Sequence, residues 1–399
     1  MRIDRRASRL SFRTQRRRSG CLSLPLLLGL IVGALATSLL RPSQWLNFGA
    51  PLTTPSADLT PALQAFNRGD LNEAIRLAGA LLEMQPENSG ALLVLARALI
   101  YRSYSDYDRD ADRATALQLT GEMLARHPRD VDVMAVHAFA LQANGQPVTA
   151  AQTAQEALKA DPEHALARMA LALSYSGVGS HELSLRENLL AIESPGWQLD
   201  TRRALALSYS GVGDYRNAVE SIQKAITLNP RLIPLYFERA LYARQLGDAD
   251  AATVAYFQIL AYDEGNVKAR LRLCELSSLM RQRDSAIQFC QQVTDRAPDW
   301  AEGWYQLGRE YFLQGNFAQA QQHLNRCSSL QVMQEVPVEA RRFECWYMQG
   351  QAAEILGDCP ALLATYQEYR TMALDAGLLQ TWIYPPEGPP DCVETPTES

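Results

Sequence analysis

The residue types that carry catalysis or bind metals are scattered along this 399-residue sequence and share no motif spacing. The five histidines stand far apart, with no HExxH and no other paired metal-ligand pattern. There is no phosphate-binding glycine loop, no GxSxG elbow and no dinucleotide fingerprint. The acidic residues form no pair spaced for acid–base catalysis. The sequence therefore predicts no enzyme, no cofactor and no metal site.

The cysteines offer a different chemistry, because six of the seven fall in the last third of the chain. No CxxC occurs, which argues against a zinc ribbon and against a thioredoxin-like redox site. An even number of cysteines outside a membrane permits disulfides, and six cysteines allow fifteen pairings. Buried reduced thiols acting as small apolar groups remain the alternative. The six are Cys274, Cys290, Cys327, Cys345, Cys359 and Cys392.

The amino terminus has the pattern of a membrane anchor. Residues 1–20 form a basic tail with eight arginines, and residues 21–40 then run without a charge. Twenty residues of helix span about 30 Å, which matches the hydrocarbon core of a bilayer. The arginine excess places the amino terminus in the cytoplasm and the rest of the chain outside it. We therefore predict a single-pass membrane protein with a signal anchor at 21–40 and a linker at 41–57.

Two other interpretations of the amino terminus stay open. Ala34, Leu35 and Ala36 form a small-x-small site, so a cleaved signal peptide would leave a secreted protein. An arginine-rich, acid-poor start is also typical of a mitochondrial transit peptide. Beyond residue 41 the net charge is about −14, which disfavours nucleic acid as a partner.

Residues 58–377 repeat with a period of 34. The segment ALALSYSGVG occurs at 170–179 and again, unchanged, at 204–213. A fixed period of this length indicates an array of helical hairpins. The curvature of such an array creates a concave surface that can bind a partner, and the repeats leave little sequence for a separate catalytic domain.

The best-formed unit, WYQLGREYFLQGNFAQA, begins at Trp304 and has Gly308, Tyr311, Gly315 and Ala320 at fixed spacing. With these residues the sequence resembles the tetratricopeptide repeat (TPR) family. The resemblance implies an all-α fold, a right-handed α-solenoid of about nine TPR-like helix-turn-helix units, preceded here by the single transmembrane helix. In such units small residues allow close helix packing and the turn glycine adopts dihedral angles that other residues avoid.

Some units depart from the pattern. The second is lengthened by SYSDYDRD at 103–110, which predicts a longer loop between its helices. Another has Arg281 where the turn glycine is expected. The hairpin geometry that the resemblance implies favours a disulfide between Cys274 and Cys290. Cys327 with Cys345, and Cys359 with Cys392, are weaker pairings based on proximity in sequence.

The resemblance also implies that the first helices of the units line a concave groove that binds partner proteins or peptide segments. Tyr305, Arg309 and Phe312 are the strongest candidates, although packing between units is the alternative role for every candidate. The lysine and asparagine pair with which some family members hold a terminal carboxylate is not found at the corresponding positions. The predicted groove residues are Phe139, Met169, Leu173, Arg203, Leu207, Phe237, Leu241, Leu271, Tyr305, Arg309, Phe312 and Tyr347.

These patterns predict a membrane-anchored scaffold or adaptor that binds partner proteins in envelope assembly or secretion. A self-assembling solenoid, a possible homo-oligomer, is the structural alternative, and a secreted repeat protein follows if the signal segment is cleaved. Residues 378–399 form a Pro-rich, acidic tail in which Trp382 and Tyr384 could cover the last helix.

Overall fold

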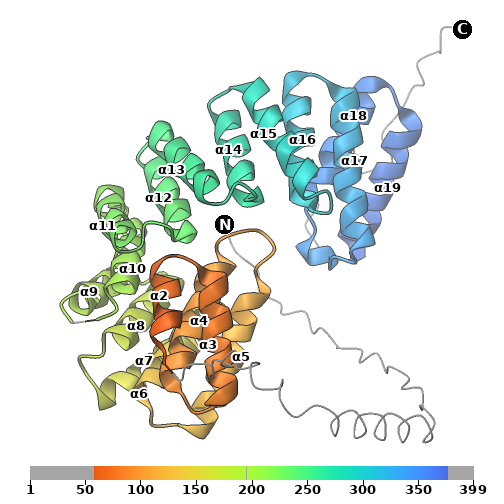
Figure 1. The fold of residues 1–399 in the computed structure, drawn as a ribbon. Coiled ribbons are helices and arrows are strands. Elements are labelled where there is room, and N and C mark those ends of the chain that lie inside the picture. Colours follow the sequence, from red (N-terminus) through yellow and green to blue (C-terminus); the bar gives the residue numbers. More distant parts are fainter. Residues whose placement is uncertain (1–57, 195, 376–399) are drawn as a thin grey trace, which may run out of the picture. The chain divides into compact units, whose positions relative to one another are not determined.

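The computed structural model describes residues 58–194 and 196–375, and within these ranges the regular elements are helices alone. Eighteen α-helices, α2 to α19, follow one another as nine packed pairs (Figure 1). The predicted all-helical repeat solenoid is confirmed. We number the pairs repeat 1 to repeat 9 and call their members first and second helices.

The first helices supply the inner positions that the repeat pattern assigns to binding. They are α2 (Thr60–Asn67), α4 (Ser89–Ser103), α6 (Val131–Ala143), α8 (Ala165–Gly177), α10 (Gln198–Gly211), α12 (Ile233–Gln245), α14 (Val267–Leu279), α16 (Ala301–Gln314) and α18 (Glu344–Leu356). The second helices are α3 (Leu71–Met84), α5 (Ala111–Arg126), α7 (Pro147–Ala160), α9 (His181–Ala191), α11 (Tyr215–Leu228), α13 (Ala249–Tyr262), α15 (Arg283–Arg296), α17 (Phe317–Met333) and α19 (Cys359–Asp375).

The turn between the two helices of a repeat requires a left-handed residue. Gly213 and Gly315 have φ values of +82° and +86°, in the turn positions that the sequence predicts. Arg281 takes the same position in repeat 7 with φ +60°. Left-handed geometry is costly for a residue with a side chain, so the repeat architecture determines the turn even where glycine is missing.

The helices of a pair approach closely at small residues. Ala218 and Ala320 are fully buried in their second helices. A Cβ atom added to Gly308 would lie 2.7 Å from Cγ of Leu324, which leaves no room for a side chain. The predicted role of these small residues is confirmed, since larger ones would force the helix axes apart.

Two cysteine pairs join neighbouring helices. Cys274 of α14 is bonded to Cys290 of α15, with Cα atoms 5.3 Å apart. Cys327 of α17 is bonded to Cys345 of α18, with Cα atoms 5.9 Å apart. Both distances fall in the usual range for disulfides. Cys359 is buried, and Cys392 lies outside the described residues.

Repeats distant in sequence also touch. Asn229, in the turn before α12, donates its side-chain N–H to the carbonyl of Phe66 at the end of α2, 2.8 Å away. At the neighbouring α2–α3 turn, a Cβ atom on Gly69 would lie 2.8 Å from the Arg231 backbone. The turn that precedes repeat 6 therefore packs against repeat 1. The loop of repeat 2 makes further contacts, which are described below.

The predicted tail 1–20, anchor 21–40, linker 41–57 and carboxyl-terminal tail 378–399 lie outside the described residues. Of the helices that the structure does describe, none combines the length and the apolar character needed to cross a bilayer.

Candidate functional site

A cavity of about 460 Å³ lies against the first helices of repeats 4 to 7. Five of the predicted groove residues line it, on three consecutive first helices. Leu173 comes from α8, Arg203 and Leu207 from α10, and Phe237 and Leu241 from α12. Several of these positions are related by the 34-residue period, so the repeat places equivalent side chains side by side along the inner surface.

The other inner positions predicted for the groove do not line this cavity. Phe139 and Met169 are each 1% exposed and belong to the main apolar core. Leu271 is 2% exposed because Tyr107 and Trp300 pack over its cluster. The prediction that these side chains line a groove is corrected for all three, since they pack between helices.

The four candidates in repeats 8 and 9 lie outside the cavity lining and contact other side chains. Tyr305 lies under the guanidinium of Arg342, 4.4 Å from the ring centroid. Phe312 packs edge-on against a neighbouring ring. Arg309 donates to the side chains of Ser278 and Glu310, and Tyr347 accepts from Gln351.

The polar wall of the cavity contains residues that the sequence analysis did not select. Arg203 forms an ion pair with Glu238 of α12, with the closest N–O distance 2.5 Å. Arg272 of α14 pairs with Glu275 at 2.6 Å. Burial raises the pKa of Glu238 above its usual value, against the opposing effect of Arg203.

Lys268 places a buried ammonium group on this wall. Its ammonium donates to the carbonyl of Tyr104 at 2.8 Å and lies over the ring of Phe237, 4.7 Å from the centroid. Burial lowers the pKa of Lys268 to about 8. A local signal existed for this residue, because Lys268 and Arg272 occupy the positions 34 residues after Pro234 and Glu238, which also line the cavity.

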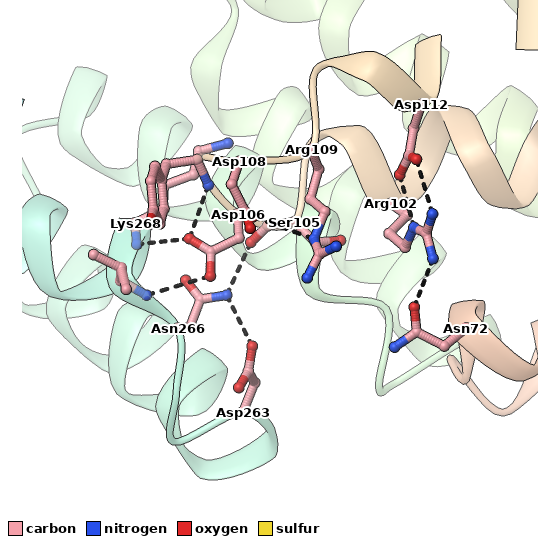
Figure 2. Close-up of polar contacts among 12 residues, drawn as sticks. Asn72, Arg102, Ser105, Asp106, Asp108, Arg109, Asp112, Asp263, Asn266 and Lys268 are labelled. Atoms are coloured by element: carbon pink, nitrogen blue, oxygen red, sulfur yellow. Dashed lines mark hydrogen bonds and ion pairs between the residues drawn. The ribbon is translucent and has the colours of Figure 1, made fainter. Parts of the chain in front are cut away.

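The predicted longer loop of repeat 2 comprises residues 104–110 between α4 and α5, and it contacts the start of α14 (Figure 2). The carboxylate of Asp106 accepts the backbone N–H of Lys268 at 3.0 Å and that of Val267 at 3.4 Å. Asn266 donates to the carbonyl of Ser105 at 2.9 Å (Figure 2). We call this set of contacts the clasp.

An aromatic pair extends the clasp. The rings of Tyr107 and Trp300 stack with their centroids 4.4 Å apart, and both pack against the apolar cluster that contains Leu271. The loop of repeat 2 therefore touches the residues that begin both repeat 7 and repeat 8. It covers the start of α14 and the cluster that contains Leu271, whereas Lys268 and Arg272 of the same helix line the cavity.

A second long-range network lies beside the cavity. Arg97 of α4 pairs with Asp200 of α10 at 2.5 Å, and both side chains are buried. The guanidinium of Arg97 lies between the rings of Phe66 and Trp197, 4.4 and 4.5 Å from their centroids. Tyr101 donates its hydroxyl to the same carboxylate at 3.1 Å. These contacts join repeats 1, 2 and 5.

No cluster of three or more histidine, cysteine, aspartate or glutamate side chains within 58–194 and 196–375 is arranged to hold a metal ion. The cavity instead presents apolar side chains on one side and paired and unpaired charges on the other. Such a surface can bind a chain segment.

The described helices form an all-helical solenoid of repeated helix pairs. Three family models, all described as tetratricopeptide repeat, match residues 61–112 and 137–190, residues 204–232 and 301–331, and residues 243–309. Together the matches cover more than half of the chain. The chain belongs to the tetratricopeptide repeat family.

Solved structures give the same fold. A chain of the APC/C hetero-tetramer Cut9–Hcn1 is similar with a TM-score of 0.55 and 15% identity, over 73% of this chain. This chain spans 54% of the length of that one. The human IFIT1 dimer with m7Gppp-AAAA is similar with a TM-score of 0.51 and 13% identity, over 78% of this chain and 80% of that one. A comparison with curated proteins gives no match.

Proposed function

We propose that this protein is a scaffold or adaptor that binds a segment of a partner protein in the cavity on α8, α10, α12 and α14. The observation that carries this proposal is the cavity of about 460 Å³, lined by five of the side chains that the repeat pattern assigns to the groove. A cavity of this size, with an apolar wall and a few fixed polar groups, suits the side chains of a bound segment.

We further propose that the chain is anchored by residues 21–40, with the repeats on the outer side of the membrane. The arginine-rich flank before this apolar segment supports that orientation. The cysteine pairs at Cys274–Cys290 and Cys327–Cys345 support it as well, because disulfides persist in oxidising compartments. A role in envelope assembly or secretion would follow from this location.

Photo-cross-linking tests the cavity. A benzophenone amino acid replaces Leu241, which lines the cavity and is 41% exposed. The control replaces Val254, which is 58% exposed on the second helix α13 and does not line the cavity. We expect a discrete adduct from position 241 in intact cells, and its loss when Leu207→Glu is added.

The outcomes separate the candidate functions. The same adducts from both positions, or none from position 241, would contradict binding in the cavity. An adduct of two copies of this chain would favour the self-assembling solenoid. For the orientation, protease added to spheroplasts should degrade the repeats, and complete protection would exclude an outer location.

A further inference from the structure

The basic side chains on the cavity wall are only half neutralised. Arg203 and Arg272 each have a carboxylate partner. Arg244 and Lys268 also line the cavity, and no carboxylate of the described chain lies within ion-pair distance of either one. With these two cations, the cavity lining has four basic side chains and one acidic side chain, Glu238, in a protein region whose overall charge is negative.

The same wall contains an acceptor without a donor. The Oε2 atom of Glu238 is buried and has no hydrogen-bond partner, while its other oxygen is held by Arg203. A buried carboxylate oxygen left unpaired is costly, so this atom favours a ligand that brings an N–H group. A peptide backbone supplies such groups at regular intervals, beside side chains of either charge.

We infer that the cavity binds an acidic peptide segment, with acidic side chains against Lys268 and Arg244, a backbone N–H on Glu238, and an apolar side chain against Leu207 and Leu241. This inference rests on the proposed function and specifies the chemistry of the partner. It differs from recognition of a chain terminus, because nothing in the cavity requires the carboxylate to be terminal.

Proton binding by Lys268 provides a signature of the carboxylate. Its pKa is about 8 because burial disfavours the ammonium. A bound carboxylate stabilises the ammonium and so raises this pKa. Above pH 8, binding must therefore take up a proton, and the affinity falls up to about tenfold per pH unit. The charged groups that face Lys268 are Asp106, Asp110, Arg113, Glu238 and Arg272.

The experiment selects random twelve-residue peptides, displayed on phage, against the full-length chain in mild detergent. We expect enriched sequences that carry aspartate or glutamate next to a large apolar residue. Synthetic versions with free or amidated carboxyl ends, and with glutamine for glutamate, are then measured by fluorescence anisotropy. Replacing the acidic side chains should weaken binding about tenfold or more, whereas amidation should not.

Variants connect the selected peptides to the cavity. Arg244→Gln and Lys268→Met should each lower the affinity for the acidic peptide and leave the affinity for its glutamine version unchanged. Lys268→Arg should bind the acidic peptide with an affinity that does not depend on pH near 8. The matched controls are Lys159→Met and Lys224→Met, which remove the same charge from exposed sites on α7 and α11. Circular dichroism checks that each variant is folded.

The outcomes distinguish the inference from the proposed function. Enriched peptides without acidic residues that still depend on Leu207 and Leu241 would overturn the inference alone. The absence of any enriched peptide that depends on the cavity would contradict both. If a 5′-triphosphorylated oligonucleotide bound at this site in preference to peptides, the partner would be a nucleic acid and the inference would be overturned.

Discussion

Asp106 offers the sharpest test of the clasp, because it acts on a helix that begins 161 residues later in the chain. Three amides of the first turn of α14 need acceptors that the helix itself cannot supply. Asn266 accepts the amide of Ala269 at 2.9 Å, and Asp106 accepts those of Val267 and Lys268. Asp106→Ala removes the acceptor for two of the three.

The magnitude follows from two opposing effects. Loss of a capping acceptor costs about 0.5–2 kcal/mol, and an amide left without a partner in a partly buried site costs about 1–3 kcal/mol. The burial of the Asp106 carboxylate reduces the stability that these hydrogen bonds provide, because desolvation disfavours the charged form and raises the pKa of Asp106 despite its backbone hydrogen bonds. We therefore expect a loss of about 2 kcal/mol for Asp106→Ala, within the range of these estimates.

The raised pKa of Asp106 also fixes a pH dependence. Below the ordinary pKa of aspartate the side chain is protonated in both states and its folded form carries no charge penalty. The protonated Asp106 therefore contributes stability below the pKa of the unfolded chain. As the pH rises through the higher pKa of the folded chain, the carboxylate becomes charged and this contribution to stability is lost. Asp106→Asn keeps one acceptor oxygen without the charge, so it should stay within about 1 kcal/mol of the natural chain at neutral pH.

Hydrogen exchange measured by mass spectrometry reads the clasp locally. A loss of about 2 kcal/mol corresponds to roughly thirtyfold faster exchange for peptides that cover the start of α14 and the loop 104–110. Asp248→Ala is the control, because Asp248 caps its own helix α13 through the amide of Ala251. Unchanged exchange at Val267 and Lys268 in Asp106→Ala, or equal acceleration in all repeats, would refute the reasoning.

Three further predictions follow from particular contacts. In urea unfolding, Gly69→Ala should lower the free energy of unfolding by more than about 1 kcal/mol, because the φ of Gly69 is +78° and its surroundings are closed. Gly79 has open space around it, so Gly79→Ala should raise the free energy of unfolding by about 0.5–1 kcal/mol. Similar unfolding midpoints for the two variants would contradict this. Arg97→Ala should cost about 3–5 kcal/mol by leaving the carboxylate of Asp200 buried and unpaired, and Arg97→Met with Asp200→Leu should recover most of it in thermal melts. After ¹³C-methylation of the lysines, the resonance that Lys268→Arg removes should titrate with a pKa of about 8, because burial disfavours the ammonium. Titration of this resonance with the ordinary lysine pKa of 10.5 would exclude the buried ammonium.

The regular part of the fold was predictable from the sequence because it depends on local spacing. The 34-residue period determines where a turn must be left-handed, which is why Gly213 and Gly315 were assigned correctly. It also determines where helices come closest, as at Gly308. Along α10 and α12 the same phase identified Arg203 and Phe237 on the cavity wall, since neighbouring repeats there are related by simple stacking.

The sequence could not predict the places where distant repeats meet. Leu271 has the phase of a groove residue, yet it is buried in a cluster against which Tyr107, from an insertion far earlier in the chain, packs together with Trp300. Periodicity describes contacts between neighbours, and it contains no information on a partner about five repeats away. The unpaired oxygen of Glu238 could not be predicted for a different reason, because a repeat period gives the position of a side chain and not the hydrogen bonds of its individual atoms.

The clasp and the cavity meet in one residue, and this links the shape of the array to its binding surface. The backbone N–H of Lys268 is held by Asp106, while its ammonium is held by the carbonyl of Tyr104 and faces the cavity. Because Tyr104 and Asp106 belong to the same loop, this loop holds both the backbone and the ammonium of the lysine. A repeat array without this insertion would let α14 move relative to α4, and the cation would then have no fixed place. The clasp therefore preorganises the cavity, which reduces the ordering cost that a bound segment would otherwise incur.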